Sequence, residues 1–156
     1  FKPDLVIANH GGNDGQNLKL PKRDRAVWGT EKWNAEYIKR VGAFIKIAQK
    51  SGAKFINLGM PIMRSARFSK KMKALNGITK RGTEKVGAIY VDTWDLAATS
   101  KGKYRESFMV GKKKRLLRQS DGIHYSTRGG AYVVSKLMPR LTRKVTFGSG
   151  KTKKKK

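Results

Sequence analysis

The chain has 156 residues with 38% hydrophobic content, which is enough for one folded domain with its own core. It contains no cysteine, so disulfides, thiol catalysis and cysteine-ligated zinc are excluded. Its 37 basic and 10 acidic residues give a formal net charge of +27, which predicts an attraction to polyanions that falls with salt. No apolar run approaches the roughly 18 residues of a membrane-spanning helix.

The first third of the chain shows a strand, a helix and a second strand. Residues 5–8 form a short continuous apolar run, which predicts a buried strand. From Thr30 to about Ser51, apolar residues recur at spacings of three and four, which predicts a helix. Thr30 is a suitable N-cap for it, and Gly52 a suitable stop. Residues 54–58 predict the next strand.

The middle of the chain repeats this alternation. A helix is predicted from Phe68 to about Val86, followed by a stop at Gly87 and a third strand over residues 88–91. Its apolar stripe consists of Met72, Leu75 and Ile78. Three strands alternating with two helices predict parallel strands joined by right-handed crossovers, and therefore a three-layer α/β/α fold. In such folds the loops that follow the strands meet at one edge of the sheet, where ligands bind.

The last third is less regular. Within residues 94–120 a hairpin is expected around Gly111. A final helix is predicted to begin at Ser126 or Thr127, and Pro139 is expected to kink or end it. The apolar face of this helix is expected to consist of Ala131, Val134, Leu137 and Met138.

The most informative feature is the segment 121–124, Asp-Gly-Ile-His, which places the carboxylate of Asp121 three residues before the imidazole of His124. A lone histidine is as often a structural residue as a catalyst. An aspartate in a glycine-containing loop ahead of a helix can accept a hydrogen bond from one imidazole nitrogen while the other faces a cleft. Such an aspartate fixes the tautomer and stabilises the imidazolium formed during general-base catalysis. The spacing alone is a weak motif, because it also arises by chance.

A second feature is the glycine-rich loop that carries Asn13 directly after the first strand. One interpretation is a turn, because Asn and Asp tolerate left-handed conformations. The other is that the Asn13 amide donates a hydrogen bond to a developing oxyanion, an effect worth roughly 3 to 4 kcal/mol in a serine hydrolase. Taken alone, this loop is as ambiguous as the histidine segment.

Together and in this order, the two features resemble the third and fifth sequence blocks of the SGNH (GDSL-type) hydrolase family, Gly-x-Asn-Asp and Asp-x-x-His. The resemblance extends to residues 57–61, 91–94 and 117–126. It covers about Lys2 to Leu141 and is strongest to a bacterial, exported branch of that family. It implies a flavodoxin-like three-layer α/β fold with a parallel sheet, in which residues 1–145 are the C-terminal part and the N-terminal strands are missing.

The resemblance also implies an activity and the residues that perform it. The family consists of serine esterases that form an acyl-enzyme, and the expected substrates are O-acyl esters, O-acetyl esters of small molecules or polysaccharides among them. His124 would be the general base, Asp121 its orienting carboxylate and Asn13 an oxyanion donor. Gly12 and Asp14 would shape the loop. A periplasmic or secreted location is implied by the same branch.

The nucleophilic serine of the family lies in a Gly-Asp-Ser block on its first strand, and this chain has no counterpart. All of its serines lie downstream of the Asn-Asp pair, in the wrong order. We therefore expect the nucleophile upstream of Phe1, and we expect the strand at residues 5–8 to form an exposed apolar edge. Residues 146–156 are rich in lysine and are expected to form a disordered tail.

Other interpretations of the sequence stay open. The net charge of +27 fits a polyanion or nucleic-acid binding module, although the basic residues are not interleaved with aromatic ones as a stacking platform requires. A pseudoenzyme that has lost its nucleophile is a further alternative. His10 and the tryptophans are expected to serve packing. Two distant histidines and sparse carboxylates do not form a metal-ligand set, and no cofactor is expected.

Overall fold

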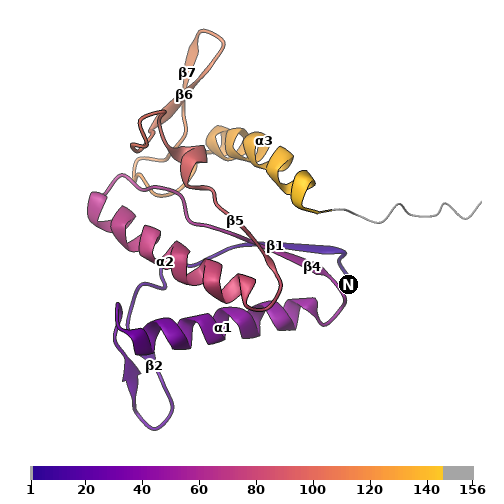
Figure 1. Cartoon of the computed structure of the whole chain (residues 1–156). Helices are drawn as coiled ribbons and strands as arrows, with labels where there is room; N and C mark the ends of the chain where they lie inside the picture. Colours follow the sequence, from indigo (N-terminus) through magenta and orange to yellow (C-terminus); the bar gives the residue numbers. More distant parts are fainter. Residues whose placement is uncertain (1, 146–156) are drawn as a thin grey trace, which may run out of the picture.

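The computed structural model describes residues 2–145 as a three-layer α/β/α body (Figure 1). Its sheet consists of β1 (Leu5–Asn9), β4 (Lys54–Leu58) and β5 (Ile89–Val91), which pair in the order β1-β4-β5. Both pairings are parallel, and the register places Ile56 beside Ile7 on one side and beside Ile89 on the other. The predicted fold class is therefore confirmed.

Two helices cover one face of this sheet. They are α1 (Glu31–Gln49) and α2 (Ala66–Glu84), and they pack on Phe55 of β4. The fully buried side chains of this layer include Trp33, Ile45, Met72 and Leu75. The predicted apolar stripe of the second helix is therefore confirmed, because Met72, Leu75 and Ile78 are all buried, whereas Phe44, one of the recurring apolar residues of the first helix, is 46% exposed.

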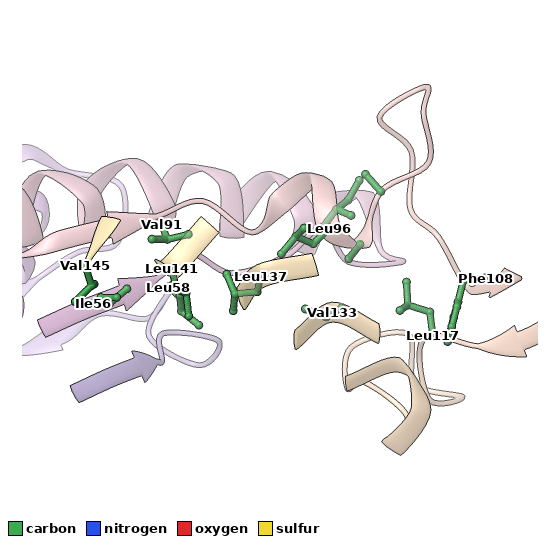
Figure 2. Close-up of a cluster of buried hydrophobic side chains, with 13 residues drawn as sticks. Ile56, Leu58, Val91, Leu96, Phe108, Leu117, Val133, Leu137, Leu141 and Val145 are labelled. Carbon is green, nitrogen blue, oxygen red and sulfur yellow. The ribbon is translucent and has the colours of Figure 1, made fainter. Parts of the chain in front are cut away.

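The third helix, α3 (Thr127–Lys144), covers the opposite face. Its buried side chains Val133, Leu137 and Leu141 join Ile56 and Leu58 of the sheet in a second hydrophobic cluster (Figure 2). Alternate residues of β4 thus point to opposite helical layers, as the period of a strand requires.

Side-chain caps determine where the helices begin. The hydroxyls of Thr30, Ser65 and Ser126 each accept a hydrogen bond from the backbone N–H three residues later. The cap at Thr30 and the start of the last helix at Ser126 or Thr127 agree with the sequence predictions. The predicted bounds of the second helix were shifted by two residues, because Ser65 caps it at Ala66 and it ends at Glu84.

Of the four residues predicted for the buried face of the last helix, only Leu137 is buried, and the helix does not end at Pro139. Val134 and Met138 are 52% and 47% exposed, whereas Val133 and Leu141 are buried. The helix also continues past Pro139 to Lys144. Pro139 has no N–H to donate to the preceding turn, but the buried residues on both sides of it pack on the same cluster and hold the helix together.

Smaller elements connect these layers. A short antiparallel pair, β2 (Leu18–Lys19) and β3 (Arg25–Ala26), was not predicted. A 3-10 turn, η1 (Trp94–Ala97), follows β5. The expected hairpin at Gly111 is confirmed as β6 (Ser107–Val110) and β7 (Lys113–Leu116), which project from the body (Figure 1).

The first strand is less buried than predicted. No residue of β1 is fully buried, and Ile7 is 45% exposed. The reason is its position, because within residues 2–145 β1 pairs only with β4 and its other edge is open. The expected exposed apolar edge is therefore confirmed, while the tail predicted for residues 146–156 lies outside the described residues. No helix among residues 2–145 is long and apolar enough to span a membrane.

Candidate active site

The loop between β7 and α3 holds the predicted pair of acid and imidazole. The Nδ1 atom of His124 lies 2.6 Å from Oδ2 of Asp121. The other carboxylate oxygen of Asp121 accepts hydrogen bonds from the backbone N–H groups of Ile123 and His124, at 2.7 and 3.0 Å. The sequence spacing of three residues thus produces the predicted orientation. The His124 Nε2 atom has no hydrogen-bond partner within residues 2–145.

These contacts favour the ionised form of the aspartate. The hydrogen bond from His124, followed by the two backbone N–H groups, lowers the pKa of Asp121 to about 2. The carboxylate is therefore charged at neutral pH, and it can hold an imidazole as the Nδ1–H tautomer or stabilise an imidazolium. Both side chains are accessible, His124 at 72% and Asp121 at 40%.

The conformation of this loop requires a glycine that packs closely against the side chain of Arg64. Gly122 has a φ of +72°, and a Cβ atom there would lie 2.5 Å from the Cβ of Arg64. The loop is closed by hydrogen bonds from Gly122 N–H to the Gln119 carbonyl and from Gln119 N–H to the His124 carbonyl, at 3.0 and 2.8 Å. The imidazole therefore stands on a tight, self-bonded turn.

The loop after β1 carries Asn13. Its turn is closed by a hydrogen bond of 2.9 Å from Asp14 N–H to the Gly11 carbonyl. The carboxylate of Asp14 accepts a hydrogen bond of 2.8 Å from the hydroxyl of Tyr37 on α1. Burial, followed by this carboxylate, raises the pKa of Tyr37, so the hydroxyl stays protonated and can donate. Asp14 thus anchors the loop to a helix.

The glycine that this loop requires is not the one that the sequence indicated. Gly11 has a φ of +111°, and a Cβ there would lie 3.1 Å from Leu75 Cδ2. Gly12 has no left-handed φ, and a Cβ there would make an ordinary contact of 3.4 Å with Met60. Gly12 lines a cavity together with Asn13, while Gly11 sets the backbone of the turn.

Asn13 and His124 line the same cavity, of about 290 Å³. They come from loops that follow β1 and β7, more than a hundred residues apart in the chain. The amide nitrogen of Asn13 has no acceptor within residues 2–145, whereas its backbone carbonyl accepts from Gln16. The rest of the cavity wall is largely apolar and includes Met60, Pro61, Met63 and Phe68. We call this space the Asn13–His124 cavity.

The apolar wall is fixed by side-chain hydrogen bonds at the end of β4. The amide of Asn76 on α2 both donates to and accepts from the backbone of Met60, at 2.7 Å each. The hydroxyl of Thr93 donates to the carbonyl of Gly59 at 2.5 Å. A Cβ at Gly59 would collide with the hydroxyl of Tyr90, so the strand end packs closely on β5.

Arg118 is a site residue to which sequence reasoning assigned no role. It is 1% exposed, and its guanidinium donates to the carbonyls of Ile123 and Ile62 at 2.5 and 2.8 Å. It lies 4.0 Å from the centre of the Tyr125 ring. Burial lowers the pKa of Arg118, and neighbouring groups oppose that shift. The guanidinium therefore ties the histidine loop to the β4 loop, and no motif signals such a contact.

The remaining predicted residues have packing roles. His10 lies edge-on to Phe44, with ring centres 5.4 Å apart, and lines a neighbouring cavity of about 520 Å³ that Asn13 also borders. Burial lowers the pKa of His10, and Asp14 opposes that shift. Trp33 is fully buried, and its indole N–H donates to the Gln16 carbonyl at 2.7 Å.

Comparison with known protein families assigns the chain to one of them. The family model described as "Protein of unknown function (DUF459)" matches residues 1–140. The chain belongs to this DUF459 family. A comparison with curated proteins finds no match.

Two solved structures resemble the DUF459 chain. One, described as "a putative platelet activating factor from Streptococcus pneumonia", has a TM-score of 0.61 and 14% identity over 88% of this chain. The other, described as "a putative acylhydrolase" from Bacteroides fragilis, has a TM-score of 0.56 and 16% identity over 91% of this chain. The alignments cover 59% and 62% of those chains, so the DUF459 chain spans about three fifths of their length. At these identities the likeness establishes the α/β fold of acylhydrolase structures.

Proposed function

We propose that this DUF459 chain carries the general base and one oxyanion donor of a serine ester hydrolase of the SGNH type. His124 is the base, Asp121 orients its ring, and Asn13 donates to the oxyanion. The observation that carries the proposal is the convergence of Asn13 and His124 on one cavity, with the Nδ1 side of the ring held by Asp121. The acylhydrolase-like fold supports it.

The chemistry follows from this arrangement. Nε2 of His124 takes the proton of an attacking hydroxyl as the oxygen bonds to the acyl carbon. The carbonyl oxygen becomes an oxyanion, to which the Asn13 amide donates. Collapse of this tetrahedral intermediate breaks the ester bond, and the leaving alkoxide receives the proton from His124. Water then attacks the acyl-enzyme by the same route, which releases the acid and restores the hydroxyl.

The attacking hydroxyl is proposed to come from a residue outside this stretch of 156 residues. Among residues 2–145, no serine lines the Asn13–His124 cavity. Ser65 and Ser126 cap helices, and Ser69 bonds to the Met63 backbone. The greater length of the similar structures is consistent with an additional segment.

The substrate is proposed to be a short O-acyl ester, such as an O-acetyl group on a carbohydrate. The cavity of about 290 Å³ has room for a small acyl group, and its apolar wall at Met60, Pro61 and Phe68 suits a methyl group. The carbohydrate acceptor and a periplasmic or secreted location rest on the sequence resemblance.

Ester hydrolysis by the longest protein that the reading frame encodes tests this function. We expect it to hydrolyse p-nitrophenyl acetate and His124→Ala to lower kcat/KM by about a thousandfold or more. Asn13→Ala should lower it by about a hundredfold. His10→Ala is the matched control, because His10 is the second histidine and lies outside the cavity. Activity that survives His124→Ala, or that falls equally with His10→Ala, would remove His124 from its role.

A further inference from the structure

The β6–β7 hairpin presents an apolar surface that nothing in the described body covers. Met109, Val110 and Leu116 are 59%, 57% and 59% exposed. The pairing places Met109 opposite Lys114 and Val110 opposite Lys113, so the apolar side chains occupy both faces of the hairpin. Gly111 has a φ of +57°, which permits the tight turn at the end. We call residues 109–115 the hairpin tip.

The hairpin tip is also strongly basic. Lys112, Lys113, Lys114 and Arg115 are consecutive, and no acidic residue occurs between Ser107 and Ser120. None of these four cations forms an ion pair with a carboxylate within residues 2–145. The positive charge is therefore available to an external anion.

We infer that the hairpin tip docks the protein on an anionic lipid bilayer. Exposed apolar side chains that lie directly across the hairpin from long cationic side chains match the layered chemistry of such a surface, where acyl chains lie beneath phosphates. The cations Lys113 and Lys114 would meet the phosphates while Met109 and Val110 enter the interface. A nucleic acid offers no apolar layer for these side chains. A protein partner needs roughly 800 Å² of contact on each side, whereas the exposed apolar side chains of the tip belong to one short hairpin of two four-residue strands.

The position of the hairpin connects docking with the candidate active site. The chain passes from β7 through Leu117 and Arg118 directly into the histidine loop. The hydroxyl of Ser126 donates to the Leu116 carbonyl at 2.6 Å, which ties the base of the hairpin to the start of α3. If the proposed hydrolase function holds, docking brings the Asn13–His124 cavity to esters of membrane-bound molecules. The docking itself does not depend on that function.

Vesicle binding by the whole chain tests the docking, with a control that the structure supplies. Met109→Ser/Val110→Ser removes the apolar tip, and Val134→Ser/Met138→Ser removes the same residue types, at similar exposure, from α3. We expect wild type to sediment with vesicles of phosphatidylglycerol and phosphatidylcholine. The tip variant should bind about tenfold more weakly, and the α3 variant as wild type does.

Binding at high salt and substitution of lysines distinguish this docking from a general attraction to polyanions. At about 1 M salt, where charges are screened beyond roughly 3 Å, the difference between the two apolar variants should persist. Lys113→Gln/Lys114→Gln should weaken binding to anionic vesicles more than Lys46→Gln/Lys50→Gln, which removes equal charge from the region of α1. Equal binding by the two apolar variants would overturn the inference. The inference would also be overturned if Met109→Ser/Val110→Ser weakened binding to duplex DNA as much as it weakened binding to the vesicles. Circular dichroism verifies that each variant is folded.

Discussion

The two loops that line the Asn13–His124 cavity are held in opposite ways. The loop that carries Asn13 is fixed by side chains from the helices. Tyr37 and Trp33 on α1 bond to it at Asp14 and Gln16, and Lys71 on α2 donates to the Gly15 carbonyl at 2.6 Å. Its conformation therefore depends on the α1 and α2 layer being assembled.

The loop that carries His124 is largely held by its own residues. Asp121 accepts from two backbone N–H groups and from the imidazole within four consecutive residues. Its contacts with the rest of the body include the Arg118 guanidinium and the hydrogen bond from Arg64 N–H to the Gly122 carbonyl, at 3.2 Å. The contact between Asp121 and His124 is thus encoded locally, whereas the approach of His124 to Asn13 is a property of the tertiary structure.

The largest expected effect on stability distinguishes substitutions at two neighbouring glycines, Gly129 and Gly130, at the start of α3. A Cβ at Gly129 would collide with the backbone carbonyl of Leu117, whereas a Cβ at Gly130 would meet nothing within 4 Å. Gly129→Ala should lower the free energy of unfolding by about 3 kcal/mol, because backbone must move. Gly130→Ala should raise it by about 0.5 to 1 kcal/mol, as expected for Gly to Ala in a helix. Urea unfolding measures both, and equal effects would contradict the close approach of α3 to the histidine loop.

Arg118→Ala tests the long-range support of the histidine loop. It leaves the carbonyls of Ile123 and Ile62 without their donor in a buried position, so unfolding should become easier by about 2 to 3 kcal/mol. Arg118→Lys should recover only part of this loss, because an ammonium lacks the planar fork. The measurement is again urea unfolding. Full recovery by lysine would show that charge alone is required.

A third pair of variants tests the turn that carries Asn13. Gly11→Ala forces a side chain into a left-handed φ beside Leu75 and should cost about 1 to 2 kcal/mol. Gly12→Ala should change the free energy of unfolding by less than about 0.5 kcal/mol. Thermal unfolding compares the two. A larger effect at Gly12 would reverse the assignment of the strained position.

The smallest expected effect concerns pH and the aspartate of the histidine loop. Because the pKa of Asp121 is lowered from 3.8 to about 2 on folding, its ionised form favours the folded state above the unfolded value. The stability difference between wild type and Asp121→Asn should therefore be constant above pH 3.8 and shrink as pH falls toward 2. Unfolding curves at several pH values measure it. A difference independent of pH over this window would show that these hydrogen bonds do not hold the carboxylate.

The sequence predicted much of this fold because periodicity and capping are local. Strands β4 and β5 and helix α1 follow directly from apolar spacing and from Thr30. The face of α3 was mistaken, because the sequence offers two sets of apolar residues at helical spacing, and only packing on the sheet buries Val133, Leu137 and Leu141 rather than Val134 and Met138. Arg118 was missed for the same reason, since its partners lie in two different loops. The pairing of Asp121 and His124 was predictable because it spans only four residues.

The convergence of Asn13 and His124 is tested most directly by NMR on the chain itself. We follow the side-chain amide signals of Asn13 while the pH is varied through the protonation of the His124 ring. We expect these signals to shift in step with the ring in wild type and to stay constant in His124→Ala, because both groups line one cavity. Asn13 signals whose chemical shifts stay constant while the ring signals shift, or that shift equally in His124→Ala, would contradict the convergence.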